Sequence, residues 1–199
     1  MHHNRPNNEH TIRVALKNRH LRHHHNQYDV LMIDELGLAH TQGRIDLAVF
    51  NGNLHGYEIK SVGDTLARLP RQLAIYSDAL QKLTLVVATR HLDGADMIAP
   101  DWCGLIEVIC GPRGGTTFAS HRRARINPDL DPFIFAHLLW RPEAQHLLRL
   151  RGASNADVSA PRKQLYRSLA NELSVGELAS AIKSAMALRT RWRDRPLLS

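Results

Sequence analysis

Apolar positions recur along the chain with two different periods, and the changes of period predict the order of the elements. Spacing of three and four residues is typical of helices, and strict alternation is typical of strands. An unbroken apolar run, Leu-Thr-Leu-Val-Val-Ala, is typical of a buried parallel strand. The predicted elements are a helix (9–21), a strand (28–35), a hairpin (44–60), a helix (65–81), a strand (83–88) and two short strands (105–110 and 116–119).

The last third of the chain is predicted to be helical. Prolines and aspartates at 127–132 form a linker or a hinge, and the pattern after it predicts helices at 133–140, 142–150, 159–172 and 174–193. We therefore expect an α/β domain with a mixed central sheet at residues 1–126 and a basic helical region at 127–199.

The hairpin pairs two alternating strands around Asn51-Gly52-Asn53. A two-residue turn at Asn51-Gly52 would align Asp46 with Tyr57 and split the apolar face. A three-residue loop instead aligns Asp46 with Glu58 and makes the apolar face continuous. The pattern favours the three-residue loop, with the two acids roughly 4.5–5.5 Å apart at Cβ.

Asp46, Glu58 and Lys60 then lie together on one face of the hairpin. Two carboxylates so close repel each other unless a proton or a cation lies between them, and oxygen ligands suit Mg²⁺ or Mn²⁺. The alternative is a solvated strand face on which Glu58 pairs with Lys60 or Arg44.

Composition and charge limit the classes of protein. Hydrophobic content of 43%, two cysteines without metal-ligand spacing, and the absence of a long apolar run indicate a cytoplasmic protein without a membrane helix. Formal net charge is +7; residues 1–140 hold 15 Lys and Arg against 14 Asp and Glu, while residues 141–199 hold 11 against 5. This asymmetry predicts a polyanionic partner for the C-terminal part, in the first place DNA.

The chain resembles the PD-(D/E)XK nuclease superfamily in its order of elements, in Asp46 on the second strand and in Glu58-Ile59-Lys60 on the third. The fold of that superfamily is the restriction-endonuclease-like αβββαβ core. Gln72 and Tyr76, one helical turn apart, are similar to the Gln-x-x-x-Tyr motif of its RecB-like branch. The alternative for these two is a surface Gln72 and a core Tyr76. The resemblance covers residues 9–110 and lacks the proline before Asp46, where Ile45 stands.

The resemblance also implies an additional acid upstream of Asp46. Glu35 at the end of the first strand is preferred, and Glu9 at the start of the first helix is the alternative.

The resemblance implies an Mg²⁺-dependent nuclease. Asp46, Glu58, the carbonyl of Ile59 and Glu35 would bind the metal, Lys60 would position the attacking water, and Gln72 and Tyr76 would orient the substrate or the metal ligands. Two alternatives stay open, a DNA-binding protein without turnover and an oligomerisation protein, and so does a homodimer. The sequence does not decide between DNA and RNA.

Overall fold

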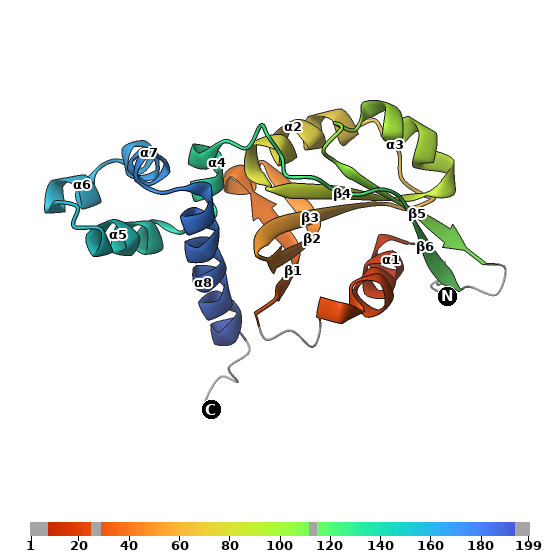
Figure 1. Cartoon of the computed structure of the whole chain (residues 1–199), viewed down its shortest axis with the longest axis horizontal. Coiled ribbons are helices and arrows are strands. Elements are labelled where there is room, and N and C mark those ends of the chain that lie inside the picture. Colours follow the sequence, from red (N-terminus) through yellow and green to blue (C-terminus); the bar gives the residue numbers. More distant parts are fainter. Residues whose placement is uncertain (1–7, 25–28, 112–114, 194–199) are drawn as a thin grey trace.

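The computed structural model describes residues 8–24, 29–111 and 115–193 (Figure 1). Its strands form one mixed sheet in the order β1-β2-β3-β4-β5-β6. The β1–β2, β2–β3 and β5–β6 neighbours are antiparallel, and β3, β4 and β5 are parallel, so α2 and α3 serve as the crossovers between parallel strands. The strands are β1 (Leu31–Leu38), β2 (Gly43–Asn51), β3 (Asn53–Lys60), β4 (Lys82–Ala88), β5 (Gly104–Cys110) and β6 (Thr116–Arg122).

The hairpin has the predicted register. Phe50 pairs with Leu54 and Leu47 with Tyr57, which confirms the three-residue loop. Gly52 has a φ of 69°, the left-handed conformation that glycine adopts without steric strain.

Helices cover both faces of the sheet, so the domain has three layers. Figure 1 shows α1 on one side and α2 and α3 on the other. Ile12 and Leu16 pack with Leu47 and Tyr57 on the first face, and the larger core cluster lies on the second. These helices are α1 (Glu9–Ala15), continued by a π-helical turn (Leu16–His20), α2 (Leu69–Ala79) and α3 (Leu92–Ile98).

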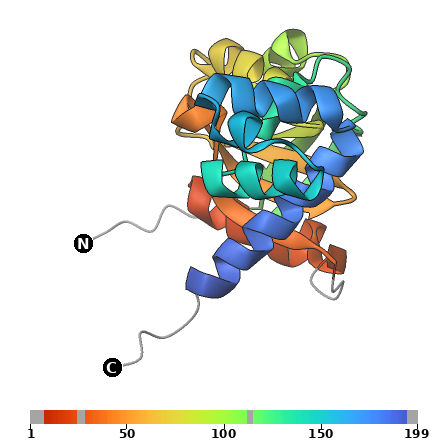
Figure 2. The same cartoon turned by 90° about the vertical axis from the view of Figure 1, so that its left-hand side faces the viewer.

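The C-terminal helices gather beside one end of the sheet (Figures 1 and 2). Their buried residues, for example Leu165 and Ile182, belong to the same core cluster as Leu85 in the sheet. The division at residue 126 stays a prediction, but one apolar core spans it. The helices are α4 (Pro132–Ala136), α5 (Arg141–Leu150), α6 (Asn155–Ser159), α7 (Arg162–Glu172) and α8 (Val175–Arg193), and short 3-10 turns lie at Arg22–His24, Ala39–Thr41 and Thr89–His91.

Some boundaries differ from those predicted. The first strand begins and ends three residues later than expected, because Leu36 and Leu38 continue to pack beyond the two acids Asp34 and Glu35. Residue 28, the predicted start of that strand, lies outside the described residues. Helix α3 was not predicted, since it is only seven residues long and contains a glycine.

The hairpin face that carries the charges is buried rather than solvated. Asp46, Glu58 and Lys60 expose 9%, 2% and 6% of their surface. Helix α2 covers this face, and α1 packs on the opposite face of β3. Within the described residues, no helix is long and apolar enough to cross a membrane.

Candidate functional site

The ladder between β1 and β2 is interrupted at Glu35. The strands pair on both sides of it, at Asp34 and at Leu36, but Glu35 itself is unpaired. Its φ is 57°, a left-handed conformation that costs a residue with a side chain roughly 1–2 kcal/mol. The surrounding register places Glu35 opposite Asp46.

The ladder between β2 and β3 ends beside the same residue. The last pair is Leu47 with Tyr57, and the register continued by one step places Asp46 opposite Glu58. Instead of a backbone carbonyl, the Asp46 Oδ2 atom accepts the N–H of Ile59 at 2.7 Å. The carboxylate thus links the two strands at the point where their backbones separate.

Glu58 is the centre of a buried hydrogen-bond arrangement. Its Oε1 accepts from Lys60 Nζ at 2.6 Å and from Gln72 Nε2 at 2.7 Å, and its Oε2 accepts from the Tyr76 hydroxyl at 2.6 Å. Lys60 also donates to Gln72 Oε1 at 2.9 Å. The structure therefore brings Gln72 and Tyr76 to the hairpin, as their helical spacing indicated.

Burial makes each of these contacts energetically important. A carboxylate and an ammonium out of water are tolerated when they pair and their remaining hydrogen-bonding groups are satisfied, and Glu58 with Lys60 meet both conditions. Burial and the neighbouring Glu58 carboxylate raise the pKa of Tyr76, so its hydroxyl remains a donor.

Asp46 has no ion-pair partner within the described residues. Burial, followed by repulsion from Glu58, raises its pKa from 3.8 to about 7, although the hydrogen bond from Ile59 acts in the opposite direction. At neutral pH a substantial fraction of this carboxyl group is therefore protonated. The site can take up or release a proton here.

The two candidates for the additional acid are both held by an arginine of α1. Arg13 lies 2.5 Å from Glu35 and 3.7 Å from Glu9, and Arg44 lies 2.8 Å from the other Glu35 oxygen. Glu35 is therefore compensated by two guanidinium groups rather than aimed at Asp46 or Glu58. Both acids still line the same pocket as the hairpin charges.

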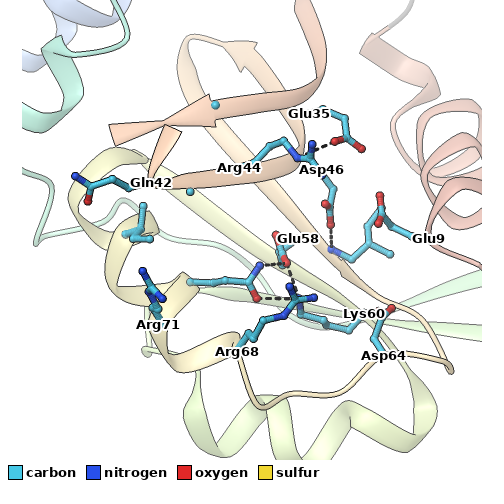
Figure 3. Close-up of a pocket in the computed structure, with 15 residues that line it drawn as sticks. Glu9, Glu35, Gln42, Arg44, Asp46, Glu58, Lys60, Asp64, Arg68 and Arg71 are labelled. Carbon is cyan, nitrogen blue, oxygen red and sulfur yellow. Dashed lines mark hydrogen bonds and ion pairs between the residues drawn. The ribbon is translucent and has the colours of Figure 1, made fainter. Parts of the chain in front are cut away.

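That pocket has a volume of about 840 Å³ (Figure 3). Arg68, the N-cap residue of α2, and Arg71 in its first turn form part of the wall. Both are exposed, and neither has an acidic partner within the described ranges. These two arginines were not among the predicted site residues. The four-residue spacing from Arg68 to Gln72 could have revealed the first, because such residues share one helix face.

The residues predicted to bind Mg²⁺ or Mn²⁺ do not form a preassembled metal centre. Over residues 8–24, 29–111 and 115–193, no group of three or more His, Cys, Asp or Glu side chains is placed to hold an ion. The Lys60 ammonium already neutralises Glu58 and two arginines neutralise Glu35, so a dication would have to compete with them. Metal binding stays a prediction, with Asp46 as the uncompensated oxygen ligand.

Comparison with known proteins decides the family. The family model of bacteriophage P4 protein cII matches residues 2–197. The chain belongs to the bacteriophage P4 cII family. Protein cII of Enterobacteria phage P4 is 26% identical over 175 residues, which are 86% of this chain and 64% of the relative, so the chain spans less than two thirds of that relative's length. No solved structure matches the chain significantly.

The family assignment corrects the expectations that came from the resemblance. Membership of the PD-(D/E)XK superfamily was wrong, because the matched region includes every motif residue and identifies another family. The prediction of phosphodiester hydrolysis, in which Asp46 and Glu58 hold Mg²⁺ and Lys60 positions the water, was wrong for the same reason. So was the description of the chain as an enzyme and as a metal-binding hydrolase.

The geometry explains why the motif misled. Alternation on β3 turns Glu58 and Lys60 to one side, and helical spacing turns Gln72 and Tyr76 toward them. The same spacing therefore encodes a satisfied buried hydrogen-bond arrangement as well as it encodes a catalytic site. Residue types at a spacing report the geometry of a site rather than its chemistry.

Proposed function

We propose that the chain binds nucleic acid, in the first place DNA, without cleaving it. The observation that carries the proposal is the pair Arg68 and Arg71. Both are exposed on the wall of the 840 Å³ pocket, and neither has an acidic partner in the described part of the chain. A guanidinium group donates parallel hydrogen bonds to phosphate oxygens, which makes unpaired arginines in a concave site suitable phosphate ligands.

Three of the acids that line the pocket are neutralised by groups other than these two arginines. Arg13 and Arg44 compensate Glu35, and Lys60 compensates Glu58. Asp46 is partly protonated at neutral pH, because its pKa is raised to about 7. Arg68 and Arg71 are then the exposed cations of the pocket that lack an acidic partner among the described residues, and Asp64, which accepts from Ser61, lines the pocket as well.

The charge of the whole chain supports a polyanionic ligand. Formal net charge is +7, and 11 of the cations lie in residues 141–199. Lys163 and Arg167 of α7 are exposed and have no acidic partner among the described residues. Binding that depends on such contacts weakens steeply as salt rises, because phosphate-bound counterions are released on association.

The proposal includes the finer fold class. Helix α1, three antiparallel strands, α2 and the parallel strand β4 follow one another as in a restriction-endonuclease-like αβββαβ core. A fold supports binding sites and catalytic sites alike. We therefore propose this core as a scaffold for binding alone.

Mg²⁺ or Mn²⁺ enters the proposal as a ligand of the pocket rather than as a catalyst. Support comes from Asp46, which is buried and lacks a cation partner within the described residues. A dication there would neutralise the carboxylate and present a positive charge to phosphate.

The experiment is fluorescence anisotropy of the full chain with labelled duplex DNA, single-stranded DNA and RNA of equal length, over a range of salt concentrations. The test variant is Arg68→Gln with Arg71→Gln. The matched control is Arg123→Gln with Arg149→Gln, which removes two exposed charges that do not line the pocket. Light scattering of the free protein gives its oligomeric state, since a homodimer also stays a prediction.

We expect the test variant to bind at least tenfold more weakly and to reduce the salt slope by about two, one unit for each lost phosphate contact. The control should stay within about threefold of wild type, and the probe should be recovered intact. Equal losses in both variants would place binding outside the pocket. No binding of any probe at low salt would overturn the proposal.

A further inference from the structure

A second, smaller cavity lies where the corner between β1 and β2 meets the C-terminal helices. Its volume is about 330 Å³, and Gly37 lines both this cavity and the larger pocket, so the two adjoin. Its lining combines apolar, aromatic and cationic side chains, among them Leu36, His40, His137, Trp140, Arg162 and Met186.

The corner beside this cavity is held in a strained conformation. Ala39 and His40 have φ values of 46° and 56°, each costing roughly 1–2 kcal/mol for a residue with a side chain. His40 stacks on His137 with ring centroids 4.0 Å apart, and Arg162 donates to His40 Nδ1 at 2.9 Å. Strain of this kind persists where the surroundings fix the backbone, and it is concentrated at ligand sites.

Two groups in the lining, Arg162 and Trp140, are exposed to a ligand, and a buried histidine nitrogen lies close to them. Arg162 is exposed and has no acidic partner among the described residues. The Nδ1 atom of His137 is buried without a hydrogen-bond partner there, a situation that costs about 1–3 kcal/mol unless a partner is supplied. Trp140 is 54% exposed.

The other cation of the cavity is already engaged. Arg189 pairs with Glu143, and its guanidinium lies 4.1 Å from the centre of the Trp140 ring. This contact fixes one side of the indole and leaves the exposed remainder to an incoming group. The cavity thus offers a fixed aromatic surface beside the Arg162 guanidinium.

We propose that this cavity receives one nucleotide of a single-stranded nucleic acid, with its base against Trp140 and a phosphate on Arg162. The inference rests on the proposed function and specifies its ligand. A cavity of 330 Å³ lies at the lower end of the ~300–1,000 Å³ typical of small-ligand sites, so it holds a single nucleotide but no base-paired duplex.

The chemistry of the lining supports an unpaired base. Aromatic side chains stack on bases of any sequence, and the half-exposed Trp140 offers such a surface. Because Gly37 borders both cavities, the strand continues from Arg162 toward Arg68 and Arg71 in the larger pocket.

The test compares a single strand of about 12 nucleotides, within the range of known single-strand sites, with a hairpin duplex of the same composition whose two strands are joined by a linker without bases. The variants of the full chain are Trp140→Ala and Arg162→Gln. Leu150→Ala and Arg149→Gln are matched controls, since they remove an exposed apolar side chain and an exposed charge that line neither cavity. Thermal melts establish that each variant is folded.

We expect Trp140→Ala and Arg162→Gln to weaken single-strand binding about tenfold, and to change hairpin binding less than about twofold. Trp140→Phe and Arg162→Lys should recover most of the loss. A set of strands that each lack one base tests the contact directly. At one position, loss of the base should weaken binding by the wild type but not by Trp140→Ala, because the missing base and the missing indole remove the same contact.

The outcomes separate the two proposals. If the wild type binds and only the Arg68 and Arg71 variant is impaired, the second cavity is no subsite, while nucleic-acid binding stands. If single-strand and hairpin probes lose affinity equally in Trp140→Ala, the specificity for an unpaired base is refuted. Absence of binding to every probe removes the proposed function and the inference together.

Discussion

The carboxylate of Asp46 accepts the backbone N–H of Ile59 at 2.7 Å, at the step where β2 and β3 cease to pair. A side chain thus provides the acceptor that a neighbouring strand normally supplies. The position is buried, so the hydrogen bond and the ionisation state of Asp46 both affect the stability of the fold.

Replacing Asp46 by Asn should flatten the pH dependence of stability. The pKa of Asp46 is raised from 3.8 in an ordinary environment to about 7, so the folded chain binds this proton more tightly than the unfolded chain does. The stability that the folded chain gains from binding this proton is therefore greatest below pH 4 and is lost as pH rises from 4 to 7. Asn keeps an oxygen to accept from Ile59 and never ionises.

We expect Asp46→Asn to be more stable than wild type by roughly 4 kcal/mol at pH 8 and similar to it at pH 4, as measured by urea unfolding. Asp78→Asn is the control, since Asp78 is exposed and its pKa is raised by a smaller burial effect. A variant whose stability falls between pH 4 and 8 as steeply as that of wild type would contradict the assigned titration.

Replacing Lys60 by Met should destabilise the chain by about 3–5 kcal/mol, because Glu58 would remain as an uncompensated buried charge. The double variant Glu58→Gln with Lys60→Met removes both charges and should recover much of that loss. Unfolding free energies of the single and double variants form a double-mutant cycle. Additive losses would show that the pair does not interact as its 2.6 Å distance implies.

Tyr76→Phe should cost about 1–3 kcal/mol, because it takes a donor from a buried carboxylate. Tyr57→Phe on the opposite face is the comparison. Its hydroxyl lies 3.2 Å from the neutral ring of His55, so its removal should cost less. Equal losses in urea unfolding would argue against a charge-assisted hydrogen bond from Tyr76.

Titration calorimetry tests the metal expectation directly. Mg²⁺ should bind more tightly at pH 8 than at pH 6, since a proton competes for Asp46 through a pKa of about 7. Asp46→Asn should abolish this difference, and Lys60→Met should strengthen binding by exposing Glu58 to the ion. Identical isotherms for wild type and Asp46→Asn would rule out Asp46 as a ligand.

Local chemistry made part of this fold predictable. The Asn-Gly-Asn loop and the alternation around it determine the hairpin register, and the apolar run at 83–88 identified β4. The helical spacing of Gln72 and Tyr76 correctly indicated that both face the hairpin. In each case the deciding contacts involve residues near in sequence or a simple repeat.

The rest depends on contacts that no local pattern contains. Glu35 is turned aside by its left-handed backbone and by Arg13, which lies 22 residues earlier. The second cavity requires His40 to meet Arg162 across 122 residues. The nuclease expectation failed for a related reason, since a few side chains at a given spacing do not determine the family or the chemistry.

Each pocket is completed at a different stage of synthesis. Every residue that lines the larger pocket lies at or before Ile75, whereas the smaller one also needs residues from His137 to Arg189. A nascent chain on the ribosome therefore contains the whole lining of one pocket about a hundred residues before that of the other. The contact of Arg189 with the Trp140 ring, which completes the smaller pocket, can form only after α8 has left the exit tunnel.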